Sequence, residues 1–177
     1  MNSEHLRNIL ESVKNGGIDI DTALAELRAT GTTTLDVADV DTGRLERTGH
    51  PEVIFGQGKE AADIVSILMR LNKANQPGLV TRVDPEKAEA IRRDLPRCIW
   101  HRRARVLHLP SEGHELKPDV RGEIVIVCAG TSDLPVAEEA AVIAEAFGHP
   151  VHRIWDVGVA GLHRILNHRE TLQSASA

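Results

Sequence analysis

Aromatic residues and cysteines are scarce in this sequence, and each scarcity excludes a class of protein. The 177 residues include two Trp, two Phe and no Tyr, so the core must be aliphatic and base stacking on aromatic platforms is disfavoured. The cysteines Cys98 and Cys128 form no CxxC pair, which argues against a disulfide framework or a thiolate zinc site and fits a reducing compartment. The nine histidines are dispersed, and His101 and His108 make no metal-ligand set, so no metal site is predicted.

Long apolar runs and an excess of positive charge are also missing. The formal net charge is −5, which disfavours binding to nucleic acid or to an anionic membrane. No apolar run reaches membrane-spanning length, and residues 1–5 lack the basic and apolar segments of a signal peptide. We therefore expect a cytoplasmic protein without nucleic-acid or membrane partners.

One stretch carries most of the functional information. An unbroken apolar run, residues 124–129, stops at Gly130, and Thr131, Ser132 and Asp133 follow before apolar residues repeat at helical spacing. Such a run is typical of a parallel strand, and a strand that turns on glycine into a helix places its loop at the carboxyl edge of the sheet, where α/β domains bind ligands. The loop suits an anionic or nucleotide-like ligand and acid/base chemistry. The structural alternative is that Thr131 or Ser132 caps the helix while Asp133 offsets its dipole.

A second glycine-containing loop follows the next expected strand, residues 151–155. Because neighbouring parallel strands end at one edge, we expect both loops to share that edge and to bind one ligand there. The structural alternative for the charged residues of this loop is a solvated helix face. The candidate ligand-binding residues of the loop are Asp156, Gly158, Gly161, His163 and Arg164.

The segment Gly56-Gln57-Gly58-Lys59 comes after a short expected strand, residues 53–55. Its backbone amides and Lys59 could cradle a phosphate. The spacing is too short for a Walker loop. The structural alternative is a tight turn between strand and helix with a solvated lysine.

The rest of the sequence predicts an α/β fold. Residues 3–14 and 21–29 are expected to form a helical hairpin, and residues 32–51 to be irregular. Residues 53–109 alternate strands and helices, with Asp84 capping one helix and the last strand being one bent strand or two. The predicted parts are a helical hairpin (1–31), an α/β region (32–110), a linker (111–121), a partial parallel-sheet domain (122–170) and a frayed tail (171–177).

The two cysteines are not predicted to be catalytic. Cys98 lies between Arg97 and Arg102, an arrangement that can lower a thiol pKa, but nothing else in the sequence marks a nucleophile there. Cys128 closes the apolar run, which favours packing as a small hydrophobic residue.

Four segments resemble the LarB family, which opens the synthesis of the nickel-pincer nucleotide cofactor of lactate racemase. They are residues 47–59 (RTGHPEVIFGQGK), 80–83 (VTRV), 128–140 (CAGTSDLPVAEEA) and 156–166 (DVGVAGLHRIL). The C-terminal domain of that family is similar to PurE-class aminoimidazole ribonucleotide carboxylases. The resemblance therefore implies a partial doubly wound parallel-sheet domain, PurE-like or flavodoxin-like, behind the α/β N-terminal region.

The resemblance also implies an activity. LarB proteins carboxylate the pyridinium ring of nicotinic acid adenine dinucleotide with CO2 or bicarbonate-derived CO2 and hydrolyse its phosphoanhydride to release AMP. Asp133 would serve a polar or proton-handling role, with Ser132 as its hydrogen-bonding neighbour. No tightly bound cofactor is implied, Mg²⁺ could assist, and PurE relatives form homo-oligomers. The residues expected to hold the dinucleotide are Arg47, Lys59, Gly130, Thr131, Asp156, Gly158, Gly161, His163 and Arg164.

The sequence departs from these families in two places. The PurE loop carries a reactive histidine, whereas the matching residues 156–162 contain none, which weakens a PurE-like purine carboxylase. LarB members continue into further strand–helix units that carry a nucleophilic cysteine, and neither Cys98 nor Cys128 matches it. We therefore expect a truncated synthase that lacks turnover, and the alternative from another class is a non-catalytic nucleotide-binding module.

Overall fold

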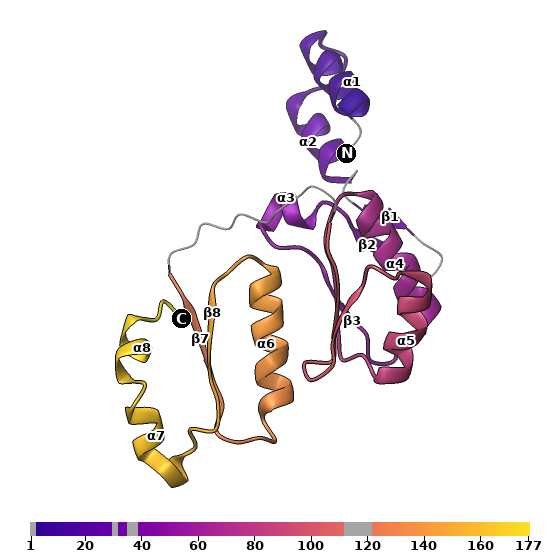
Figure 1. Cartoon of the computed structure of the whole chain (residues 1–177). Helices are drawn as coiled ribbons and strands as arrows, with labels where there is room; N and C mark the ends of the chain where they lie inside the picture. Colours follow the sequence, from indigo (N-terminus) through magenta and orange to yellow (C-terminus); the bar gives the residue numbers. More distant parts are fainter. Residues whose placement is uncertain (1–2, 30–31, 35–38, 112–121) are drawn as a thin grey trace.

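The computed structural model describes residues 3–29, 32–34, 39–111 and 122–177 (Figure 1). The strands are β1 (Thr32–Thr34), β2 (Asp39–Asp41), β3 (Val53–Phe55), β4 (Gly78–Thr81), β5 (Ile99–His101), β6 (Val106–Leu109), β7 (Ile124–Val127) and β8 (Val151–Ile154). The helices are α1 (Ser3–Lys14), α2 (Ile20–Ala29), α3 (Arg44–Thr48), α4 (Ala61–Lys73), α5 (Pro85–Asp94), α6 (Leu134–Ala146), α7 (Leu162–Leu166) and α8 (Arg169–Ser174).

The predicted helical hairpin is confirmed. Helix α1 packs against α2, and Ile9 and Ala23 are buried. Gly16 has a φ of 70°, a left-handed conformation that glycine adopts without steric cost, and it ends the first helix as expected. Asp19 accepts a hydrogen bond from the Thr22 amide at 2.6 Å, which supports the start of the second helix.

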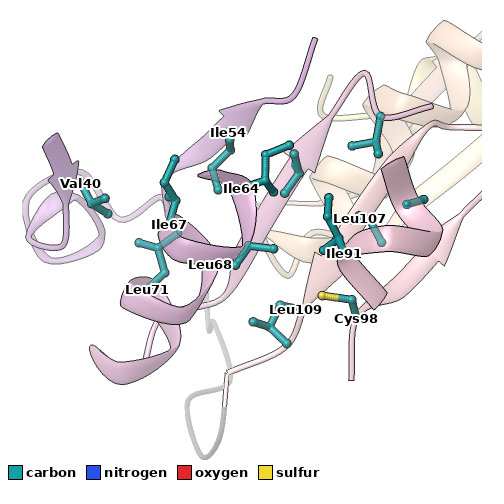
Figure 2. Close-up of a cluster of buried hydrophobic side chains, with 13 residues drawn as sticks. Val40, Ile54, Ile64, Ile67, Leu68, Leu71, Ile91, Cys98, Leu107 and Leu109 are labelled. Atoms are coloured by element: carbon teal, nitrogen blue, oxygen red, sulfur yellow. The ribbon is translucent and has the colours of Figure 1, made fainter. Parts of the chain in front are cut away.

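A four-stranded mixed sheet forms the centre of the N-terminal region. Its strand order is β3-β4-β6-β5, and only the β3–β4 pair is parallel. Residues 99–109 thus form two strands, β5 and β6, joined by a turn. Aliphatic side chains from the sheet and from α4 and α5 pack into one core, drawn in Figure 2. Helix α5 begins as predicted, because the Asp84 side chain accepts a hydrogen bond from the Lys87 amide at 2.8 Å.

Residues 32–51 differ from the expectation of irregular chain. They contain the antiparallel strands β1 and β2 and the short helix α3, and Val40 of β2 is only 1% exposed and belongs to the core. The strands have three residues each, too few to show an alternating pattern in the sequence. The Gln76 side-chain amide donates a hydrogen bond to the Thr42 carbonyl, which ties this segment to the end of α4.

The C-terminal region consists of the parallel pair β7–β8 and the helix α6, which packs on both strands. The other side of α6 meets the four-stranded sheet, where Val142 packs against Leu79, Ala104 and Val106. Figure 1 shows α6 between the two sheets. The fold is therefore mixed α/β with a parallel strand–helix–strand unit, which confirms the predicted class and is consistent with a flavodoxin-like domain.

The last residues do not form the frayed tail that the sequence predicts. Residues 169–174 form α8, and the Val125 amide donates to the Ala177 carbonyl at 2.7 Å. The Ser176 amide donates to the Glu123 carbonyl at 3.0 Å, so the chain end pairs with the edge of β7. The predicted linker lies outside the described residues except for Ser111. No helix in the described ranges is long and apolar enough to cross a membrane.

Candidate functional site

The loops after β7 and β8 lie side by side at one edge of the sheet. The two strands are parallel, with Val127 opposite Ile154, so both loops leave in the same direction. The Gly158 amide donates to the Ala129 carbonyl at 3.0 Å, and the Val157 amide donates to the Cys128 carbonyl at 3.2 Å. This confirms the predicted placement of both loops at a shared edge (Figure 1).

The loop at residues 130–133 is closed by Asp133. Its Oδ2 accepts a hydrogen bond from the Gly130 amide at 2.9 Å, and the Asp133 amide donates to the Gly130 carbonyl at 3.1 Å. Asp133 itself is the N-cap residue of α6, without a side-chain capping bond, so the alternative in which Thr131 or Ser132 caps this helix is wrong. The side chains of Thr131, Ser132 and Asp133 are exposed beside the N-terminus of α6.

The glycines of the two loops differ in whether the surrounding structure leaves room for a side chain. A Cβ at Gly158 would lie 3.0 Å from the Ala129 carbonyl oxygen, so the contact between the loops favours glycine there. A Cβ at Gly130 would meet nothing within 4 Å, and its backbone is not left-handed. Nothing in the packing therefore requires glycine at position 130, and the open space above it is available to a ligand.

Two of the charged residues in and after the second loop form an ion pair with each other. Arg164 of α7 donates to Asp156 Oδ2 at 2.6 Å, and Asp156 has a φ of 60°. This ion pair ties the loop after β8 to the helix that follows it and neutralises the guanidinium. A phosphate would have to compete with Asp156 for Arg164. His163 is exposed on α7.

Two predicted cations come from outside this edge. Lys59 lies in the turn after β3 of the other sheet, where a Cβ at Gly56 would lie 2.7 Å from the Thr81 carbonyl oxygen. Close packing against β4 thus explains glycine at position 56. Arg47 belongs to α3, and its side chain lies outside the described residues.

An ion pair that the sequence analysis missed connects the four-stranded sheet to α6. Arg82, directly after β4, has a φ of 55° and its Nε lies 2.8 Å from Glu139 Oε2 of α6. The pair places the carboxyl end of β4 against the first half of α6. Both residues lie in segments that resemble LarB, at 80–83 and 128–140, and this was the only signal in the sequence.

Neither cysteine presents a reactive thiol. Burial raises the pKa of the Cys98 thiol to about 11 and outweighs the nearby Arg92 and Arg97, so the lowering that its neighbours suggested is wrong. Cys128 is 7% exposed, and its Sγ lies 3.7 Å from the Gly130 carbonyl oxygen beneath the loop. Within the described ranges, no group of three His, Cys, Asp or Glu side chains could hold a metal ion.

Comparison with known proteins adds two findings. Residues 32–111 match the family described as the LarB/PurE-like N-terminal domain. An uncharacterized protein of Methanocaldococcus jannaschii is 32% identical in an alignment of 174 residues. The alignment covers 92% of this chain and 65% of that protein. The chain thus covers less than two thirds of the length of this relative.

Proposed function

Since the chain is a LarB-like protein that carries the N-terminal domain of that family over residues 32–111, we propose that it acts in LarB-type chemistry. The family relation is to carboxylase-type proteins. The proposed substrate is nicotinic acid adenine dinucleotide, which is carboxylated on its pyridinium ring and cleaved at its phosphoanhydride to release AMP. The proposed active site is the sheet edge formed by residues 128–133 and 156–161.

The observation that carries this proposal is the hydrogen-bonded contact between the two loops. The contact of Gly158 with Ala129 places the loop after β8 beside the first loop, which carries a helix N-terminus, two exposed hydroxyls and a carboxylate. Helix N-termini favour negative charge, and α6 has 13 residues, so its first turn suits a phosphate or carboxylate of the substrate. The open space at Gly130 lets a flat ring approach the backbone.

Asp133 is the proposed proton acceptor. Carboxylation replaces a ring C–H bond by a C–C bond, so the proton must leave to a base. The Gly130 amide holds the Asp133 carboxylate through Oδ2, which fixes its orientation at the loop. Ser132, exposed and next to Asp133 in the sequence, is the proposed hydrogen-bonding neighbour of this carboxylate.

A second candidate function is nucleotide binding without turnover. LarB chemistry uses a nucleophile that makes the ring carbon electron-rich, and a thiol is suited to that role. Both cysteines of this chain are buried, and Cys98 stays a protonated thiol at neutral pH because its pKa is about 11. This observation favours a module that keeps the binding loops without the first chemical step.

AMP release from nicotinic acid adenine dinucleotide and bicarbonate separates the two candidates. On the synthase proposal, the chain releases AMP, and Asp133→Asn reduces the rate by about 100-fold. Asp94→Asn, an equal change of charge at an exposed position of α5, is the matched control. Binding of the dinucleotide without AMP release selects the binding module. Failure to bind the dinucleotide contradicts both functions.

A further inference from the structure

A groove of about 670 Å³ lies between the β5–β6 turn, α6 and β8, away from the edge described above. Ala104 and Val142, both almost fully buried, give it apolar walls, and arginine and glutamate side chains complete its lining. Its volume is within the range of small-molecule sites, roughly 300–1,000 Å³. The residues of α6 that line it, from Glu138 to Glu145, follow Asp133 by 5 to 12 residues, about 8 to 18 Å along a helix at 1.5 Å per residue, so the groove lies beside the body of α6 and not at its N-terminus.

Both acidic side chains of the groove form ion pairs with one arginine. Arg153 of β8 donates to both oxygens of Glu145, at 2.5 and 2.7 Å, and lies 3.5 Å from Glu138. The charges of both glutamates are thereby balanced in part by Arg153 of the same C-terminal region. Arg102 and Arg103, on the opposite wall, form no ion pair with any residue that the structure describes. The exposed guanidinium groups of these two consecutive residues are thus left to a ligand.

His101 adds an unpaired polar atom to the same wall. Its Nε2 is buried and has no hydrogen-bond partner among the described residues. Burial lowers the pKa of His101, against the raising effect of Glu145 and Glu138 and with the lowering effect of Arg153. This lowering favours the neutral ring, which carries one N–H as a donor and one nitrogen as an acceptor.

We propose that this groove binds a small phosphate-bearing anion between Arg102, Arg103 and the α6 face. Guanidinium groups match phosphate oxygens with two parallel hydrogen bonds, and arginine is the usual residue for phosphate recognition. The walls come from both sheets, because the β5–β6 turn belongs to the first and Arg153 to the second. Binding therefore clamps α6 onto the four-stranded sheet. This inference does not depend on the proposed function.

The test uses the full chain, inorganic pyrophosphate as the probe, and the ring resonances of His101 in an NMR titration. The His101→Gln spectrum assigns those resonances among the nine histidines. Pyrophosphate should shift them saturably, and the Arg102→Gln/Arg103→Gln variant should weaken the apparent affinity by at least about tenfold. Arg93→Gln/Arg169→Gln removes the same charge at exposed positions elsewhere and should bind as the unmodified chain does.

Asp133→Asn distinguishes this site from the loop edge, because binding at the groove should survive that change. Circular dichroism of each variant establishes that it is folded. The proposal is overturned if the His101 resonances do not respond to saturating pyrophosphate. It is equally overturned if they respond with the same affinity when both groove arginines are replaced.

Discussion

The four-stranded sheet and the β7–β8 pair are packed very differently. Around the first sheet, Leu68, Leu71 and Ile91 are completely buried. In the second, residues 124–126 of β7 are only half-buried and Val127 is 40% exposed. Because burial of apolar area drives folding, the N-terminal region supplies most of the stability. The candidate site therefore stands on the less buried part of the molecule, which α6 joins to the better packed part.

The largest expected effect is on stability, and it tests directly whether the two sheets differ in their contribution. Leu68→Ala removes a fully buried side chain and should lower the free energy of unfolding by about 2–5 kcal/mol. Ile126→Ala, on the half-buried strand β7, should cost about half as much or less. Urea denaturation measures both. Equal losses at the two positions would show that the two sheets are equally important for stability.

A pair of glycine substitutions sharpens the comparison at the loops. Gly56→Ala places a Cβ 2.7 Å from the Thr81 carbonyl oxygen and should destabilise the chain by about 1–3 kcal/mol. Gly130→Ala meets open space and should change stability by less than about 0.5 kcal/mol. Thermal unfolding reports both changes. A large loss for Gly130→Ala would mean that packing, and not a ligand, accounts for glycine in the site loop.

A smaller effect concerns the charge pair that holds α6 to β8. The hydrogen bond from Arg153 lowers the pKa of Glu145 below its usual value of 4.5. A lowered carboxyl pKa stabilises the fold above the unfolded value, near 4.5, and this stabilisation is lost as the pH falls through the folded value. The Glu145 side chain is 43% exposed, so Glu145→Gln should cost at most about 1 kcal/mol at pH 7.

That cost should shrink as the pH falls through the lowered pKa of Glu145, because the carboxyl group then takes up a proton in the unmodified chain as well. Unfolding curves of both proteins at pH 7 and pH 3 provide the check. A difference that stays constant across this range would assign the effect of Glu145→Gln to packing instead of charge.

Local pattern was sufficient to predict much of the fold. Asp84 before Pro85 marked the start of α5, and the apolar run ending at Gly130 marked a parallel strand with its loop at the carboxyl edge. Both signals act within a few residues, because capping and strand burial are set by near neighbours and by periodicity.

Contacts between distant residues could not be predicted in this way. The Arg82–Glu139 pair and the stacking of His50 on Phe147, at 5.2 Å between ring centroids, join segments far apart in the chain. The pKa of Cys98 shows the same limit. Its sequence neighbour Arg97 suggested a lowered value, but burial by the core, which the sequence does not show locally, raises it.

The central claim is that the two loops form one site for a phosphorylated pyridine compound. Calorimetric titration of nicotinic acid adenine dinucleotide tests it most directly, with the unmodified chain, Gly130→Val in the first loop and Arg164→Ala in the second. The account predicts saturable binding that each substitution weakens by at least about tenfold, while Arg93→Ala leaves it unchanged. Absent binding, or binding with unchanged affinity in both loop variants, would contradict it.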